Sequence, residues 1–140
     1  VSLASGRDFV LVASYTGSVF GWGDNQFGQL SSANTDSLGP AVRVSPRPIA
    51  LPTRSKVTAV ACGGRHCAAI DSAGAIFTWG LNSHGQLGSG VEGSGGAVPN
   101  RTWERPHKIS LPSRVLDVVL GWRTTTVLCA SGKVYAWGGT

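Results

Sequence analysis

The sequence lacks several features that would assign it to a class at once. It has no methionine, only seven acidic residues among 140, and no apolar run near the ~20 residues of a membrane-spanning helix. Its first residues, "VSLASGRDFVLVAS", contain no basic segment followed by an apolar stretch, so we expect no signal peptide in them. Three cysteines without a Cys-x-x-Cys pair favour unpaired thiols in a reducing, intracellular compartment. Cytoplasm, nucleus and organelle stay open, and no membrane association is expected.

Catalytic and metal-binding signatures are also missing. The sequence shows no Ser/His/Asp or Cys/His constellation, no paired carboxylates at a useful spacing and no phosphate-binding loop. Cys62, His66 and Cys67 suggest zinc, but a closed zinc site has four ligands and nothing nearby completes the set. Because free cysteine is among the most buried residue types, small core residues are the better interpretation of these two cysteines and of Cys129. We therefore expect neither an enzyme nor a cofactor.

Basic residues outnumber acidic ones, which gives a formal net charge of +5 and a pI near 9.6. Such a balance favours acidic partners without selecting one. Two proline-containing stretches carry most of the basic residues: Arg43, Arg47, Arg54, Lys56, Arg101, Arg105, Lys108 and Arg114. Either these stretches are solvated linkers, or they form a basic rim for RNA, DNA or an acidic protein.

Glycine is abundant, with 20 residues, and much of it belongs to an internal repeat. The phrase "FGWGDNQFGQL" at 20–30 returns as "FTWGLNSHGQL" at 77–87 and begins again as "YAWGGT" at 135–140. The tryptophans of the Trp-Gly pairs stand at positions 22, 79 and 137, so the step is 57 and then 58 residues. A catalytic motif normally occurs once per site, whereas a phrase at a fixed step indicates repeated architecture.

Each repeat reads as short strands bounded by turn residues. Segment 56–63 is β-branched and ends on glycine, 65–71 follows a tight turn, and "SAG" leads into 75–80. Such runs are typical of hairpins. A fourth strand is expected at 107–112, where proline suits an edge strand.

Four antiparallel strands in each repeat predict an all-β fold of β-propeller blades, each a four-stranded antiparallel sheet. The expected blades are 1–52, 53–112 and an incomplete 113–140, all parts of one propeller domain. Propellers have about four to eight blades, so these are too few to close a ring. We expect further blades from a longer chain or from another subunit, and an isolated 140-residue chain that aggregates or melts without cooperativity.

The repeated phrase has a structural interpretation at each position. Tryptophan is expected to fill the ~10 Å gap between stacked sheets. The glycine after tryptophan lets the strand bend, and the glycine before Gln-Leu is expected to have a positive φ. The leucine is expected to lie at the blade interface, and the asparagine is expected to bond backbone groups of the turn. Further glycines and one histidine keep the same step. The repeat residues are Trp22, Gly23, Asn25, Gly28, Leu30, Gly63, His66, Gly74, Trp79, Gly80, Asn82, Gly85, Leu87, Gly121, Gly132, Trp137 and Gly138.

With these residues in place, the sequence resembles the regulator of chromosome condensation repeat family. The segment "VTAVACGGRHCAAIDSAGAIFTWGLNSHGQLGSG" at 57–90 follows the family repeat closely over its full length. The other units depart from it: Phe9 and Thr124 stand at the histidine position of His66, and Ser31 replaces the final glycine. The resemblance implies seven-bladed propellers. We interpret His66 as structural, capping backbone groups, with Asp71 its one carboxylate within reach.

The leading functional hypothesis is a non-catalytic protein-interaction scaffold. The insert at 88–107 is the best candidate contact surface, because Arg101, Trp103 and Arg105 match the residue types of interface hot spots. The alternative is a Gly-Ser loop with its tryptophan against its own blade.

Two other functions stay open. The resemblance implies guanine nucleotide exchange on a small GTPase, but the founding member uses a β-wedge that neither 31–50 nor 88–107 resembles. Association with chromatin or nucleic acid through the basic loops is the second.

"GWRTT" at 121–125 resembles the Gly-Trp-Arg motif of the plant UV-B photoreceptors of this family. In those proteins, tryptophans gather with arginines on one propeller face. A single copy favours packing or a central-face contact for Trp122 and Arg123. A cation–π pair of Trp122 with Arg123 or Arg65 is an alternative that the sequence leaves open.

Overall fold

The computed structural model describes residues 1–31, 42–88 and 102–139, and its regular structure there consists of β-strands. The strands are β1 Ser2–Ser5, β2 Phe9–Ala13, β3 Val19–Asp24, β4 Val42–Ile49, β5 Val57–Cys62, β6 His66–Asp71, β7 Ile76–Leu81, β8 Thr102–Ile109, β9 Val115–Leu120, β10 Thr124–Cys129 and β11 Val134–Gly138. No helix long and apolar enough to cross a membrane occurs in these three segments.

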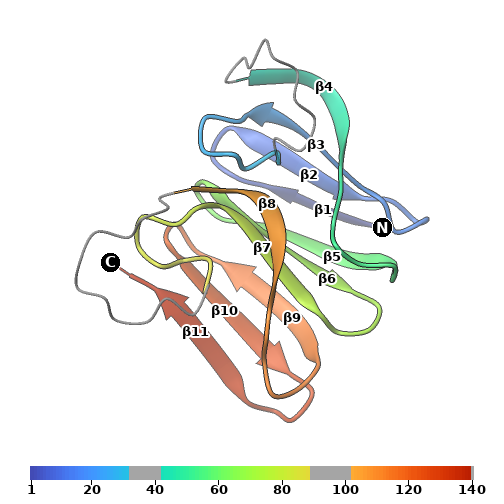
Figure 1. Cartoon of the computed structure of the whole chain (residues 1–140), viewed down its shortest axis with the longest axis vertical. Coiled ribbons are helices and arrows are strands. Elements are labelled where there is room, and N and C mark those ends of the chain that lie inside the picture. The colour runs from blue at the N-terminus through green and yellow to red at the C-terminus, as the bar shows by residue number, and fades with distance from the viewer. Residues whose placement is uncertain (32–41, 89–101, 140) are drawn as a thin grey trace.

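The strands form three antiparallel sheets that follow one another along the long axis of the molecule (Figure 1). Their orders are β1-β2-β3-β4, β5-β6-β7-β8 and β11-β10-β9. The predicted all-β architecture of four-stranded antiparallel blades is confirmed, and the third sheet has three strands within the described part of the chain. The division at 1–52, 53–112 and 113–140 stays a prediction.

The glycine turns predicted from the repeat join the second and third strand of each sheet. The amides of Gly17, Gly74 and Gly132 donate to Ser14, Asp71 and Cys129 at 2.9, 3.0 and 2.9 Å. All three glycines have positive φ, which a residue with a side chain adopts at a cost.

The fourth strands are longer than the sequence indicated. β8 begins at Thr102 rather than at His107 and ends at Ile109, before the predicted end at Pro112. Within the described residues it is an edge strand paired with β7 alone, and its residues from Glu104 to Lys108 are mostly polar. Polar composition made the first half of this strand look like a loop.

The core lies between the sheets in two clusters. Trp79, Phe77 and Leu30 belong to the cluster between the first and second sheets, and Ile70 and Val127 to the one between the second and third. The middle sheet is therefore covered on both faces, and all six residues of β6 are buried.

Ser31 holds a backbone conformation that the repeat otherwise gives to glycine. Its φ is 54°, and Gly88, one repeat later, has φ 65°. A side chain in this left-handed region costs roughly 1–2 kcal/mol. The Ser31 hydroxyl is also buried without a hydrogen-bond partner among the described residues.

Replacing Ser31 with glycine is expected to raise the free energy of unfolding by about 1 kcal/mol, because the strain is relieved at a modest entropic cost. The reverse change, Gly88→Ser, is expected to lower it by more than about 2 kcal/mol. A Cβ at Gly88 would lie 2.5 Å from the Trp137 ring. Chemical denaturation of both variants checks the pair; a destabilised S31G would contradict the assignment of strain.

Candidate interaction face and the hydrogen bonds that hold it

The glutamine carbonyl of each Gly-Gln-Leu phrase receives hydrogen bonds from the next sheet. Trp79 Nε1 donates to Gln29 O at 2.9 Å, and Trp137 Nε1 donates to Gln86 O at 2.9 Å. Trp79 is fully buried. The tryptophans thus fill the gap between sheets as predicted, and they also satisfy the backbone of the neighbouring repeat.

A second donor reaches each of these carbonyls. The thiol of Cys67 donates to Gln29 O at 3.2 Å, and the hydroxyl of Thr125, one repeat later, donates to Gln86 O at 2.7 Å. Burial, with a smaller effect of Cys62, raises the pKa of the Cys67 thiol, so it keeps the proton that it donates. Cys67 and Cys129 are buried and Cys62 is half-buried.

His66 bonds across the sheets rather than within its own hairpin. Its Nε2 lies 3.0 Å from Thr125 Oγ1, and Asp71 instead bonds Thr53 and the amides of Ala73 and Ala75. Asp71, the one carboxylate considered within reach from the sequence, stands at the opposite end of β6, so it does not bond His66. Since the Thr125 hydroxyl donates its proton to Gln86 O, it accepts from His66, which places the imidazole proton on Nε2.

The same glutamines shape the loops at one end of the sheets. Oε1 of Gln29 accepts from the amide of Phe27 at 2.8 Å, and Oε1 of Gln86 accepts from the amide of His84 at 2.8 Å. Each repeat asparagine, as predicted, bonds its own turn: Leu30 N to Asn25 Oδ1 at 2.9 Å and Leu87 N to Asn82 Oδ1 at 3.1 Å. Phe27 and His84 therefore sit at the tips of rigid loops.

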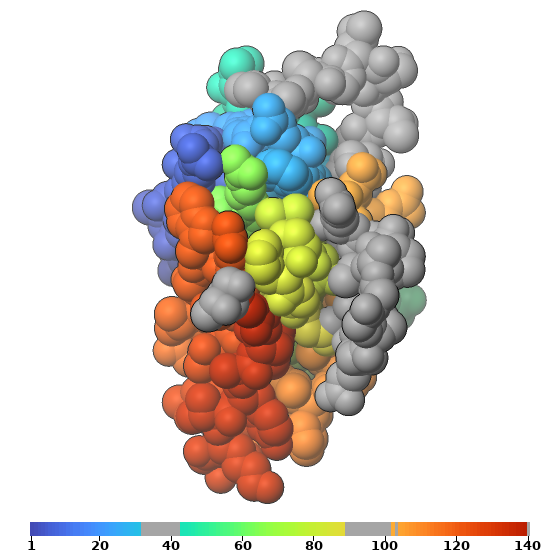
Figure 2. Space-filling model, turned by 90° about the vertical axis from the view of Figure 1, so that its left-hand side faces the viewer, coloured from blue at the N-terminus to red at the C-terminus, as the bar shows by residue number. Residues whose placement is uncertain are grey.

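These tips meet the loops between the first and second strands of each sheet. Figure 2 looks onto this end of the molecule, where loops of the first sheet (blue), the second (green and yellow) and the third (orange-red) lie together. A hollow of about 610 Å³ opens here, and we call it the central hollow. Its lining consists of Arg7, Gln26, Phe27, Gly64, Arg65, Leu81, Ser83, His84, Thr102, Trp122 and Arg123.

Cations and aromatic rings alternate in the central hollow. The guanidinium of Arg65 lies 4.5 Å from the Phe27 ring centre, and that of Arg7 lies 5.7 Å from the Trp122 ring centre. The cation–π contact of Trp122 is thus with Arg7 rather than with Arg65 or Arg123, the two partners considered from the sequence. The ring extends over Gly64, where a Cβ would lie 3.0 Å from it, and so reaches the arginine of the first sheet.

Arg123 is held by the second sheet. Its Nη1 lies 3.3 Å from His84 Nε2. Because arginine only donates, His84 accepts at Nε2 and carries its proton on Nδ1, 2.8 Å from the Ser83 hydroxyl. His84 and Arg7 were not singled out from the sequence. The signal was present, since Phe27 and His84 are one repeat apart, as are Arg65 and Arg123.

Of the other candidate contact residues, the structure describes only part. Residues 89–101, with Arg101, fall outside the described residues, as does the side chain of Trp103, whose backbone belongs to β8. Arg105 is exposed on the same edge strand. A contact surface built from these three residues therefore stays a prediction.

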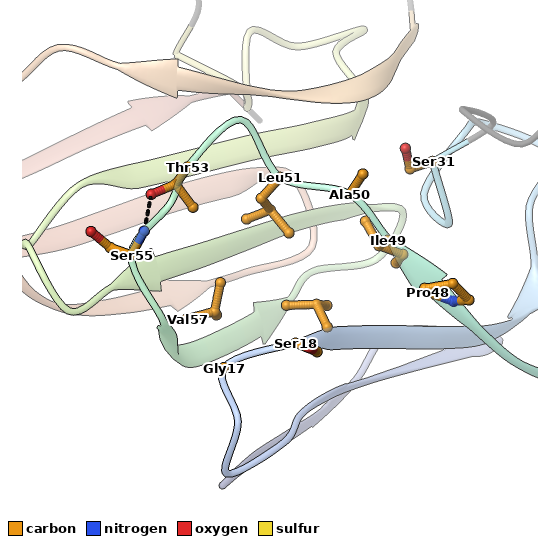
Figure 3. Close-up of a pocket in the computed structure, with 11 residues that line it drawn as sticks. Gly17, Ser18, Ser31, Pro48, Ile49, Ala50, Leu51, Thr53, Ser55 and Val57 are labelled. Atoms are coloured by element: carbon orange, nitrogen blue, oxygen red, sulfur yellow. Dashed lines mark hydrogen bonds between the residues drawn. The ribbon is translucent and has the colours of Figure 1, made fainter.

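The opposite end of the sheets carries two smaller creases. Figure 3 shows the first, of about 250 Å³, between the Gly17–Ser18 turn and the connection from Pro48 to Val57. The second, of about 350 Å³, has the same position one repeat later, next to Gly74 and Val115. Each is closed by a backbone bond, Val57 N to Gly17 O or Val115 N to Gly74 O. Their recurrence indicates seams between sheets rather than binding sites.

Sheets stacked through such contacts define a β-propeller of tryptophan-glycine repeats. The family pattern "Regulator of chromosome condensation (RCC1) repeat" matches residues 16–70 and 73–128, and a second pattern of the same description matches 1–29 and 57–86. The chain belongs to the RCC1 repeat family.

Curated relatives match nearly the whole chain. "Ultraviolet-B receptor UVR8" of Arabidopsis thaliana is 29% identical over 97% of the chain and 28% of its own length. "E3 ubiquitin-protein ligase HERC2" of Homo sapiens is 33% identical over 99% of the chain and 3% of its own length. "Guanine nucleotide exchange factor SRM1" of Saccharomyces cerevisiae is 30% identical over 99% of the chain and 27% of its own length. The chain thus spans 3–28% of the length of these relatives.

Solved structures share the fold. Human WBSCR16 superposes with a TM-score of 0.77 at 28% identity, over 99% of this chain and 34% of that one. Yeast RCC1 (Prp20) bound to Kap60 superposes with a TM-score of 0.79 at 22% identity, over 97% of this chain and 31% of that one. A second Prp20p structure is titled for its binding to Gsp1p and histones.

The buried His66 is expected to make the protein acid-sensitive. Burial lowers the pKa of His66 from its ordinary 6.5 to about 4, only partly opposed by a backbone hydrogen bond with Thr124. Between pH 6.5 and pH 4 the unfolded chain therefore binds a proton that the folded chain does not. The free energy of unfolding is thus highest above pH 6.5 and falls as the pH is lowered towards 4. Over this window the loss amounts to about 3 kcal/mol.

His66→Phe, which copies Phe9 of the first sheet, is expected to flatten this part of the stability curve. Denaturation midpoints from pH 7.5 to 4 check it, with the half-buried His84→Gln as control. His107, whose pKa burial also lowers to about 4, leaves a residual slope in both variants. An unchanged acid slope in H66F would contradict the assignment.

Proposed function

We propose that this chain is a non-catalytic part of an RCC1-type propeller whose central hollow and its rim bind a partner protein. One observation carries the proposal: three successive sheets contribute arginines and aromatic rings to a single face. Arginine and tryptophan are the residue types that dominate binding energy at interfaces. Loops on a rigid scaffold are the usual place for such contacts.

Protein partners are consistent with the relatives, whose names and titles include a GTPase exchange factor, a ubiquitin ligase, Gsp1p, histones and Kap60. Nucleotide exchange is not adopted, because no described feature of the chain supports it. The two stretches compared with a wedge insert, 31–50 and 88–107, are largely outside the described residues.

The third sheet supports a second contact, with a further blade of this chain or of another subunit. Ile70 and Ile76 of the second sheet are 3% and 1% exposed, since they pack against the third sheet. Their equivalents one repeat later, Leu128 and Val134, are 40% and 62% exposed. We propose that another blade covers this face in the working protein.

A face variant separates the interaction from folding. In the full-length protein, R7A/R65A/R123A is expected to lose at least about tenfold in partner binding, since each charged contact contributes about 1.5–3 kcal/mol. The matched control is R54A/K56A/R114A, which removes the same charge from exposed residues at the opposite end. Quantitative pull-down with equal thermal midpoints checks the pair. Equal binding by both variants would contradict the proposal.

The isolated 140-residue segment is expected to aggregate or to melt broadly, because the exposed face of the third sheet leaves that sheet half-buried. Calorimetry and sedimentation of this segment check it. A sharp, reversible transition from a monomer would contradict the second contact.

A further inference from the structure

We propose that the central hollow binds an acidic peptide segment in which carboxylates flank an apolar side chain. The inference rests on the proposed function and names the chemistry of the partner. It follows from the charge, the unused hydrogen-bond donors, the size and the walls of the hollow.

The charge of the hollow is positive. Arg7, Arg65 and Arg123 line it, and no aspartate or glutamate is among its described lining residues. Asp8 lies 3.3 Å from Arg7 at the rim. Nearby Asp24 is engaged in its own loop, where it accepts from Gln26 N and Gln29 Nε2. The two remaining guanidinium groups therefore face the hollow without a carboxylate partner among the described residues.

These arginines keep donors for a ligand. The guanidinium of Arg65 lies over the Phe27 ring, and its Nε is buried with no hydrogen-bond partner in the described part of the chain. Arg123 uses one Nη1 contact, with His84. A guanidinium has five N–H donors in a planar fork that matches a carboxylate, so both side chains are pre-oriented for bidentate binding.

Size and walls exclude a simple ion. The volume of about 610 Å³ is many times that of a water molecule, which occupies about 30 Å³ in the liquid. Phe27, Trp122 and Leu81 give the hollow apolar walls between its cations. An apolar side chain between two carboxylates would cover these walls while the carboxylates reach the arginines.

The same geometry disfavours nucleic acid. Base stacking needs open aromatic faces, which the 58% exposed Trp122 retains, so charge rather than stacking decides against nucleic acid. A phosphate backbone needs a continuous basic track. Lys56 and Arg114 instead contact the turns at Gly17 and Gly74, at the opposite end of the sheets.

The test uses the full-length protein and a fluorescein-labelled ten-residue peptide in which glutamates flank two leucines, followed by fluorescence anisotropy. A peptide with glutamine at every glutamate and a peptide with serine at both leucines are the matched probes. Binding of the first peptide is expected to exceed that of either probe by at least about tenfold. R65Q and R123Q are each expected to weaken it about tenfold or more, whereas R54Q and R114Q should change it less than about twofold.

Three outcomes would overturn the inference: equal binding of the glutamine peptide, full binding by R65Q/R123Q, or tighter binding of a thymidine oligonucleotide than of the peptide. A serine probe that binds as tightly as the leucine peptide would remove the apolar requirement and thus also contradict it. If the peptide does not bind while R7A/R65A/R123A still loses its partners in pull-down, the interaction face is supported and the acidic peptide ligand is wrong. If both fail, the face itself is wrong.

Discussion

One carbonyl group in each repeat connects the sheets, and the rest of the structure depends on it. Gln29 O and Gln86 O each accept two hydrogen bonds from the following sheet, one of them from a tryptophan ring. A carbonyl has two lone pairs, so both are used. Leaving such a buried group unsatisfied would cost about 1–3 kcal/mol. The Trp-Gly and Gly-Gln-Leu parts of the phrase thus belong together across neighbouring sheets.

The same glutamines join architecture to the interaction face. Their backbone holds the next sheet, while their side chains fix the amides of Phe27 and His84 at the loop tips. The tips can differ in chemistry, one aromatic and one basic, because the loop conformation depends on glutamine and asparagine rather than on the tip. A constant frame with variable tips lets a repeat protein build a specific surface from near-identical units.

Local features and the residue types that fill the gaps between sheets were predictable from the sequence, and the particular side-chain pairs across the sheets were not. The hairpins, the positive φ of Gly28 and Gly85, and the asparagine bonds follow from short-range rules, and the structure has them at the expected places. The contact of His66 with Thr125 and that of Arg7 with Trp122 join residues 59 and 115 positions apart. Such pairs depend on how sheets stack, which a repeat pattern gives only as a period.

The range of one edge strand and most residues of the central hollow were not predicted from the sequence, for related reasons. The first half of β8 is polar because it is an edge, so its sequence resembles a loop. The arginines of the central hollow are scattered in sequence. The repeat step relates Arg65 to Arg123, but Arg7 stands one position earlier in its own repeat, where the others have Gly64 and Trp122. The interaction hypothesis placed on Arg101, Trp103 and Arg105 used residue type alone, whereas Trp122 and Arg123 were singled out by a motif and do line the hollow.

Departures from the repeat occur in matched pairs across the sheets. His66 donates to the Thr125 hydroxyl, which can accept while it donates to Gln86 O. At the preceding interface Phe9 stands in place of the histidine, and Cys67, in place of the threonine, only donates to Gln29 O. Sulfur is a weak acceptor, so a histidine at position 9 would bury an N–H with no good partner. The phenylalanine departs from the repeat but suits the cysteine that packs in the same cluster. At these two interfaces a residue of one repeat therefore suits its neighbour in the next, so the interfaces differ even where the phrase around them is the same.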